Sequence, residues 1–545
     1  MKFPGFRQWH GVCHSWLRLL SAILLAMFVA GCQTETPPDQ APPSPDSPTP
    51  VAVPTESLET WEACFLRNSA ALPAGAKLGT GSEAAYLGLA RIGYVQTIVE
   101  PIEEAGEKCL RTTSRSVSSF QRLGQTVRQE VVVTSVERLS GEVIRLESTM
   151  SGGDAPVVTK AKFGENSVAL VTETAGKKSE QSLPWSPDYR GPFGVEQSLQ
   201  AEPLKTGKTR EISLFLPVLN IVGQARLEAV GRERVELPGG QQELIRITSS
   251  TKIGPQSLDM LMWQNDEGQV LKTEVVGIGQ VNFRATREEA LRDAEQAELD
   301  LMITSTVKLK SPAKIPLNAS KAVYLAKLRG GIGSTKFETG LSQQVEKLAD
   351  DQLRITVSRV TPTTPLPEDS ATKIEFPTDD DSRSNSLIQS DDPAVVALAQ
   401  GVAAGETEPA KIAIALEQQV HSTITKKNFS QAFASAAEVA VSKQGDCTEH
   451  AVLLAAMCRA RGIPARVAFG LVYYPPEQGF LYHMWNEVWT GDRWVPLDAT
   501  LGQGIAPVDR LKLASSSLAG ASPYAAMLPV VQVFGRLELE VIEVE

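Results

Sequence analysis

One short stretch of the chain holds a cysteine, a histidine and an aspartate in an order that suits thiol chemistry. The sequence reads GDCTEHAVLLAAMCRARGIPAR from residue 445, FLYHMWNEVW from residue 480 and RWVPLDAT from residue 493. A thiol that attacks a carbonyl carbon needs a base to take its proton, and an imidazole has a suitable pKa. The imidazole needs an acceptor on its other nitrogen, which a carboxylate supplies. Cys447, His483 and Asp498 are therefore candidates for an acyl-transfer site.

Cys447 lies at the predicted start of a helix. Asp446 is a good N-cap, and Glu449 completes the spacing of a capping box. Apolar residues follow at helical spacing, and the sequence at 462–464 ends the helix. At this first position the helix dipole favours a thiolate, and unpaired N–H groups can hold an oxyanion. His450 lies on the same helix surface, but a packed helix residue is the simpler interpretation for it, just as an isolated cysteine is often structural.

His483 and Asp498 lie on two predicted strands that flank a turn at 490–493. If residues 490–491 form a two-residue loop, Asp498 lies directly opposite His483. If residues 491–492 form the loop, Asp498 is a diagonal neighbour on the same face, and either register lets the carboxylate reach the imidazole. A three-residue loop without a bulge turns Asp498 to the other face, so the geometry is a prediction that can fail.

Taken together, these motifs resemble the transglutaminase-like superfamily, relatives of the papain-type cysteine proteases. The resemblance covers residues 390–504. It implies an α+β domain with helices packed on an antiparallel sheet. It also implies that Cys447 is the nucleophile, that His483 is general base and acid, and that Asp498 orients the imidazole.

The resemblance points to three further residues around the site. Gln444 is a candidate second oxyanion donor, because the family usually draws one from upstream of the cysteine. Trp485 and Arg466 match recurrent family positions and are candidates for residues that shape the site. The chain has no acidic loop of the kind that binds Ca²⁺, so we expect neither a metal nor a cofactor.

The N-terminus predicts a bacterial lipoprotein. Residues 1–31 carry three Lys or Arg residues and no acidic residue, and they end in a short apolar run typical of a signal peptide. The sequence Val29-Ala30-Gly31-Cys32 resembles the lipobox, whose cysteine receives a diacylglyceryl group, although an ordinary secretory signal remains the alternative. We expect a protein of the cell envelope, lipid-anchored at Cys32 on the extracytoplasmic side, and facing the periplasm from the outer membrane if the cell is Gram-negative.

The length of 545 residues predicts several domains, and the net charge of −11 argues against nucleic acid as a partner. The fold class we predict is multidomain α+β, with an antiparallel β-rich N-terminal domain ahead of the domain that resembles a transglutaminase. The expected divisions are a signal peptide (1–31), a lipidated cysteine and Pro-rich tether (32–56), a β-rich domain with a terminal helix (57–299), a small α/β module and linker (300–385) and a catalytic domain with a C-terminal strand (386–545).

The β-rich region leaves two questions open. Its alternating segments recur with turn signals between them and predict a large antiparallel sheet, which binds a ligand or serves as a spacer. Cys64 and Cys109 can pair as a disulfide in an oxidising compartment, but sequence alone does not fix the connectivity.

Two functional hypotheses follow. In the first, the chain is an anchored thiol enzyme that forms a thioester acyl-enzyme on the amide or carboxamide bonds of a protein or peptide substrate. Water as acceptor makes it a protease or amidase, and an amine makes it a transglutaminase; the sequence does not choose between them. In the second, the chain is a non-catalytic envelope binding or assembly module that works through its β-rich domain.

Overall fold

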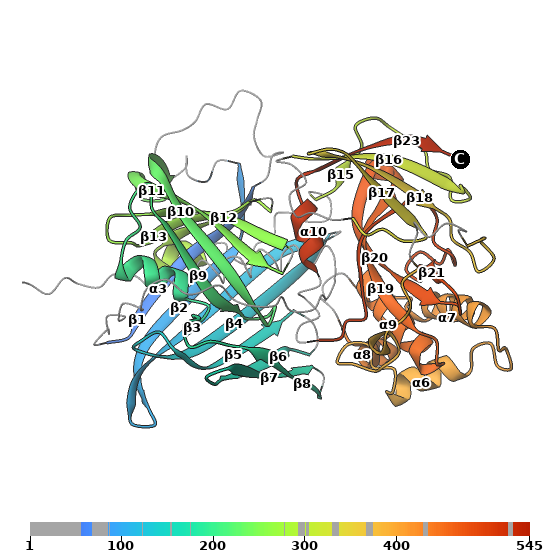
Figure 1. The fold of residues 1–545 in the computed structure, drawn as a ribbon, viewed down its shortest axis with the longest axis horizontal. Coiled ribbons are helices and arrows are strands. Elements are labelled where there is room, and N and C mark those ends of the chain that lie inside the picture. The colour runs from blue at the N-terminus through green and yellow to red at the C-terminus, as the bar shows by residue number, and fades with distance from the viewer. Residues whose placement is uncertain are drawn as a thin grey trace, which may run out of the picture.

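A large curved sheet and a mixed C-terminal region lie side by side in the computed structural model (Figure 1). The predicted signal peptide, Cys32 and nearly all of the tether lie outside the described residues. The structure describes residues 56–545, except 68–85, 87, 123, 153–154, 175, 255, 277, 293–299, 301–304, 330–336, 367–373, 429–433 and 521–526.

Within the described residues, fourteen strands form one antiparallel sheet in the order β8-β7-β6-β5-β4-β3-β2-β1-β14-β13-β12-β11-β10-β9. Each half is a meander of sequential hairpins, and the halves meet where β1 pairs with both β2 and β14. The strands are β1 (Leu58–Arg67), β2 (Leu89–Glu104), β3 (Glu107–Arg122), β4 (Gln125–Arg138), β5 (Val143–Ser151), β6 (Val157–Phe163), β7 (Ser167–Thr174), β8 (Lys177–Pro184), β9 (Thr209–Leu216), β10 (Ile221–Leu237), β11 (Gly240–Ile253), β12 (Gln256–Gln264), β13 (Val270–Val275) and β14 (Gln280–Ala285).

Alternating burial explains why these segments form strands. In β5, for example, Leu146, Ser148 and Met150 are buried and the residues between them are more exposed, as a sheet with one covered face requires. Two short helices accompany the sheet, α3 (Gly194–Ala201) and α4 (Arg287–Leu291). The prediction of a large β-rich region ahead of the Cys-His-Asp motifs is confirmed.

A second, smaller sheet joins segments from both sides of the Cys-His-Asp motifs. It has the order β17-β18-β16-β23, so the strand nearest the C-terminus returns to pair with β16 (Figure 1). Its strands are β16 (Lys321–Leu328), β17 (Gln343–Ala349), β18 (Gln352–Ser358) and β23 (Leu537–Val544).

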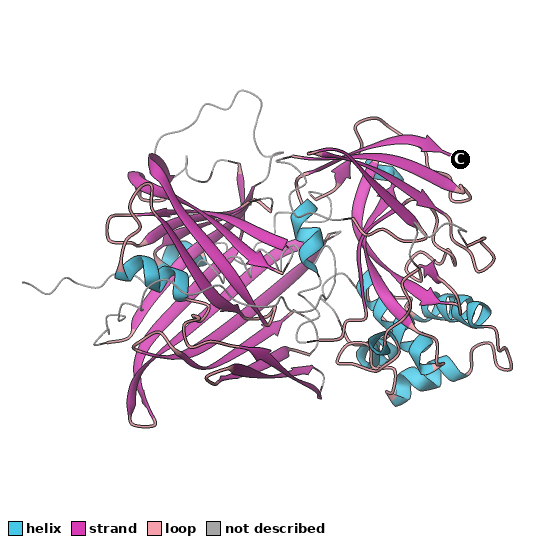
Figure 2. Cartoon of the chain, in the orientation of Figure 1, coloured by secondary structure: helices cyan, strands magenta, loops and turns pink. Residues whose placement is uncertain are grey.

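The Cys-His-Asp motifs lie on a third sheet and on helices that gather beside it (Figure 2). The sheet runs β15-β20-β19-β22, and β21 pairs with β20. Its strands are β15 (Val307–Lys308), β19 (Ala465–Tyr474), β20 (Gly479–Trp489), β21 (Trp494–Leu497) and β22 (Arg510–Ser516). The helices are α6 (Pro393–Gln400), α7 (Pro409–Thr423), α8 (Ala436–Ser442), α9 (Cys447–Ala460) and α10 (Leu528–Val533), with 3-10 turns η2 (Asp379–Asp381) and η3 (Pro475–Glu477).

Contacts between the large sheet and the C-terminal region occur at several places. Lys177, at the start of β8, forms an ion pair with Asp391. On α10, which lies between the two parts in Figure 1, Gln532 Nε2 donates to the carbonyl of Ser257 at 3.5 Å. A third contact, at the tip of the β3–β4 hairpin, reaches α9 and is described below.

Two further observations bear on the sequence predictions. Cys64 and Cys109 are both buried free thiols, so the disulfide left open by the sequence is not formed. Among the residues that the structure describes, no helix is both long enough and apolar enough to cross a membrane.

Candidate active site

The first turn of α9 holds Cys447 through a network around Asp446. The Asp446 carboxylate accepts a hydrogen bond from the N–H of Thr448 at 2.8 Å. Glu449 Oε2 accepts one from the N–H of Asp446 at 2.9 Å, which completes the predicted capping box. The predicted helix is thus confirmed, and it begins at Cys447. Because the cap also takes the N–H of Glu449, this turn has fewer free amides for an oxyanion than its sequence suggested.

The β20–β21 hairpin brings His483 and Asp498 together. Trp489 pairs with Trp494, and the N–H of Thr490 donates to the carbonyl of Arg493, so the loop is residues 491–492. This is the second of the two predicted registers, with Asp498 diagonal to His483.

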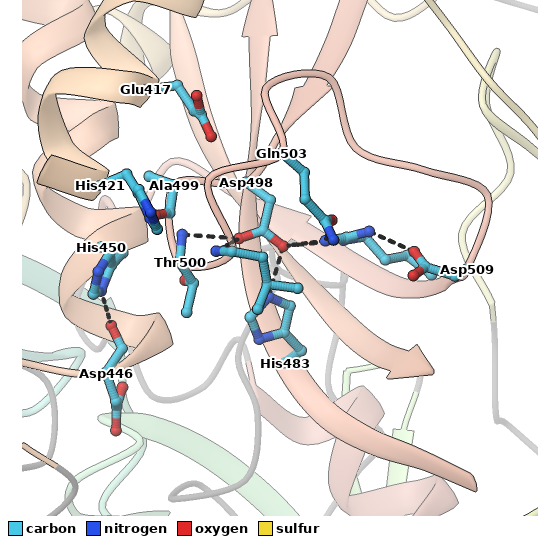
Figure 3. Close-up of polar contacts among 12 residues, drawn as sticks. Glu417, His421, Asp446, His450, His483, Asp498, Ala499, Thr500, Gln503 and Asp509 are labelled. Atoms are coloured by element: carbon cyan, nitrogen blue, oxygen red, sulfur yellow. Dashed lines mark hydrogen bonds and ion pairs between the residues drawn. The ribbon is translucent and has the colours of Figure 1, made fainter. Parts of the chain in front are cut away.

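The two side chains meet at the end of β21. His483 Nε2 lies 2.8 Å from Asp498 Oδ2, and both residues are buried (Figure 3). The other imidazole nitrogen, Nδ1, is therefore the one left to exchange a proton with a thiol. The Cys447 sulfur receives a hydrogen bond from the backbone of Met484, the residue after His483.

Asp498 is held as an anion by more than the imidazole. Its Oδ2 also accepts from Arg510 Nε at 3.1 Å, and its Oδ1 accepts from the N–H of Thr500 at 3.0 Å (Figure 3). Burial alone would raise the pKa of Asp498, but His483 and Arg510 hold it well below its ordinary range. Sequence reasoning missed Arg510, which lies on β22 outside the recognised motifs.

The thiol is less acidic than the helix dipole predicted. Burial raises the pKa of Cys447, and the neighbouring Asp446 carboxylate raises it further. Arg122 and the backbone of Met484 act in the opposite direction. The expectation that the helix start favours a thiolate left out burial and the cap's own charge, and both oppose it. A thiol of raised pKa needs a base to ionise.

Two cations that sequence reasoning missed lie near the thiol. Arg122, the last residue of β3, forms a buried ion pair with Asp446; their side chains are 4% and 1% exposed. Lys427 Nζ lies 3.1 Å from His450 Nε2, and His450 Nδ1 donates to the carbonyl of Asp446. Burial and Lys427 lower the pKa of His450 to about 4, so this imidazole is neutral and serves as a packed helix residue.

The structure places the three site-shaping candidates differently. Trp485 is buried and stacks on His483, with ring centroids 6.3 Å apart. Gln444 is half-buried and lies just ahead of α9, where its backbone forms an isolated parallel β-bridge with Lys426. Arg466 lies away from the imidazole, where it pairs with Glu487 at 2.9 Å in a buried network.

Gly470 explains how Trp485 fits there. It lies opposite His483 on β19, and a Cβ at this position would lie 1.9 Å from the carbonyl oxygen of Leu511 and 3.0 Å from the Trp485 ring. Only glycine allows this close approach of β22 and the indole.

One comparison with known proteins covers this site. Residues 396–499 match the family described as the transglutaminase-like superfamily, so this segment holds a transglutaminase-like domain. No curated protein matches the chain.

Solved structures show only distant likeness. One is "a Putative Cysteine Protease from Cytophaga hutchinsonii", with 17% identity and a TM-score of 0.25, covering 42% of this chain and 90% of that one. Another is a "Beta-barrel-like Protein of Domain of Unknown Function DUF1849 from Brucella abortus", with 10% identity and a TM-score of 0.29, covering 42% of this chain and 95% of that one.

Proposed function

We propose that this chain is a thiol acyl-transfer enzyme that acts on amide or carboxamide bonds of proteins or peptides. The observation that carries the proposal is the buried His483–Asp498 pair beside the first turn of α9, where the Cys447 sulfur bonds the backbone of Met484. A nucleophile, a base and an orienting carboxylate then occupy one site, on a domain of the transglutaminase-like superfamily.

In the first half-reaction, His483 Nδ1 takes the thiol proton while the Cys447 sulfur attacks the carbonyl carbon. The carbonyl oxygen becomes an oxyanion, for which the N–H of Cys447 and the side chain of Gln444 are the proposed donors. The imidazolium then gives its proton to the leaving nitrogen, the C–N bond breaks, and a thioester and a free amine or ammonia result.

In the second half-reaction, water or an amine gives its proton to His483 and attacks the thioester carbon. The C–S bond breaks, and the proton returns from His483 to the Cys447 sulfur. Asp498 stays ionised throughout, since His483 and Arg510 both stabilise its charge. Water makes the enzyme a protease or amidase, and an amine makes it a transglutaminase.

The test incubates the full chain and its Cys447→Ala variant with a Gln-containing protein and a fluorescent primary amine. Ammonia release, amine incorporation and new fragments are read from the same reaction. The matched control is Cys458→Ala, which removes the other thiol of α9, a fully buried one.

Each outcome has a separate meaning. Incorporation that depends on Cys447 identifies a transglutaminase, ammonia without incorporation an amidase, and new fragments a protease. The thiol enzyme is excluded if no signal depends on Cys447 and if Asp498→Asn leaves the alkylation rate of Cys447 unchanged. The non-catalytic binding module is then the remaining hypothesis.

We also propose that Cys32 carries a lipid that anchors the protein on the extracytoplasmic side of the cell envelope. The support is the apolar run that ends in Val29-Ala30-Gly31-Cys32. In a bacterial host we expect the full chain in the membrane fraction, with the added mass of a lipid on Cys32. We expect the Cys32→Ser variant in the soluble fraction. An unacylated wild-type chain in the soluble fraction contradicts the anchor.

A further inference from the structure

The tip of the β3–β4 hairpin connects the large sheet to the start of α9. Arg122 ends β3 and pairs with the buried carboxylate of Asp446. Gln125, the first residue of β4, donates from Nε2 to the carbonyl of Lys427 at 3.5 Å. The tip is itself held in place, because the N–H of Gly124 donates to Asp300 Oδ2 at 2.9 Å. The hairpin thus touches two segments that precede the thiol, one at Lys427 and one at the N-cap of α9.

The first turn of α9 has an electrostatic conflict that this contact resolves. Asp446 caps the helix as an anion, and an anion next to a thiol opposes formation of the thiolate. A buried cation paired with the carboxylate offsets that effect. Arg122 is this cation, and it interacts with Asp446, Cys447 and Glu449.

The other charges around the thiol do not replace Arg122. Glu449 adds a second acidic group, but burial and Asp446 raise its pKa to about 8, which favours its uncharged form at neutral pH. Lys427 interacts with the thiol, but burial lowers its pKa and its Nζ donates to His450. His483 faces the thiol as the proposed base and is balanced by Asp498.

We propose that Arg122, a residue of the large β-sheet, is a positioning residue for Cys447. By holding the N-cap carboxylate of α9 it fixes the first helical turn and balances the charge beside the sulfur. The large sheet is therefore part of the machinery that makes the thiol reactive, and not only a spacer or a separate binding domain. This inference rests on the proposed function, in which Cys447 is the nucleophile.

The test measures how fast iodoacetamide alkylates Cys447 in the full chain between about pH 5 and pH 10, so no substrate is needed. A charge of opposite sign within about 4–6 Å shifts a pKa by about 1–3 units. Arg122→Gln is therefore expected to slow alkylation at pH 7 about tenfold or more. It is also expected to shift the profile of alkylation rate against pH to higher pH. Asp446→Asn, which keeps a cap, is expected to move the profile to lower pH.

The double variant R122Q/D446N replaces the ion pair by a neutral hydrogen-bonding pair. Its profile is expected to lie close to that of the wild type, within about threefold at pH 7, since the two charge effects cancel. Because it leaves no buried charge unpaired, this variant tests the proposal even if a single variant fails to fold. The matched control is Arg128→Gln, on the same hairpin, whose side chain is 44% exposed and pairs with Glu130.

The outcomes separate this inference from the proposed function. If R122Q folds and alkylates with the wild-type profile, or if the double variant shifts strongly while R128Q does not, Arg122 is not a positioning residue. If instead wild-type Cys447 reacts no faster than its D498N form at any pH, the proposed function fails first.

Discussion

At the residue scale, one carboxylate oxygen of Asp498 orients the imidazole of the proposed base. Asp498 Oδ2 accepts from both His483 and Arg510, and all three side chains are buried. The imidazole is therefore oriented by an acceptor that is itself fixed by a guanidinium. The three buried groups depend on one another, because removing one of them leaves the charge of another uncompensated.

Asp498→Asn is expected to reduce acyl transfer about 10²–10⁴-fold, because the neutral amide cannot stabilise an imidazolium and turns its NH₂ toward donors that the carboxylate now accepts from. It is also expected to lower the free energy of unfolding by about 3–5 kcal/mol, since Arg510 loses one of its two carboxylate partners, the other being Asp509. Initial rates and denaturant titration measure the two effects. Asp492→Asn, an exposed change in the same hairpin, is the control, and equal effects of the two changes would contradict the assignment.

Glu449 gives the site a pH dependence of known sign. Burial and Asp446 raise its pKa to about 8, so between its unfolded value of 4.5 and 8 the folded chain holds a proton that the unfolded chain has lost. Its contribution to stability is therefore complete below pH 4.5 and is lost as the pH rises through 8.

The Glu449→Gln variant copies the protonated carboxyl and is expected to remove this loss. Thermal unfolding between about pH 5 and pH 9 should show a shallower decline for the variant than for the wild type. Parallel curves would show that another group causes the decline.

Cys447, His483 and Asp498 could be proposed from the sequence because the chemistry restricts their types and three local patterns place them. Arg510, Lys427 and Arg122 were not, since each comes from an element remote in sequence and belongs to no periodic pattern that names its partner. The acidity of the thiol was mispredicted for the same reason. The helix dipole is readable from Asp446 and Glu449, but burial by other elements is not.

At the scale of elements, local patterns predicted strands and helices, but not which strands pair. The alternation near the C-terminus predicted a final strand, and β23 is that strand. Its partner is β16, at the opposite end of the segment that carries the candidate active site. The small sheet thus holds together the two flanks of this segment, which no local pattern shows.

Leu539→Ala on β23 is expected to lower the free energy of unfolding by about 2–5 kcal/mol, because a buried leucine leaves a cavity. Leu539 is 1% exposed, whereas Ile542 on the same strand is 56% exposed. Ile542→Ala is therefore the matched control, with a change within about 0.5 kcal/mol. Denaturant titration compares them, and similar losses for both would show that β23 does not pack as described.

At the scale of the whole molecule, the ion pairs between the large sheet and the C-terminal region differ in how deeply they are buried. The Arg122–Asp446 pair is buried, but the Lys177–Asp391 pair is open to solvent, with side chains 34% and 65% exposed. Exposed pairs contribute little, because water screens them.

Lys177→Ala is therefore expected to change the free energy of unfolding by no more than about 0.5 kcal/mol and to leave Cys447 alkylation unchanged. The two measurements made on Arg122→Gln serve here as well. A strong effect of K177A on alkylation would show that docking as a whole, rather than the buried pair, governs the thiol.

The buried pair between β3 and α9 also bears on the order in which the molecule acquires its properties during folding. Contacts between segments so far apart in the chain form late, after the local hairpins and helices. On this view a half-folded chain lacks the cation beside Asp446, even where α9 has already formed. The proposed chemistry therefore becomes available only when the large sheet has docked on the C-terminal region.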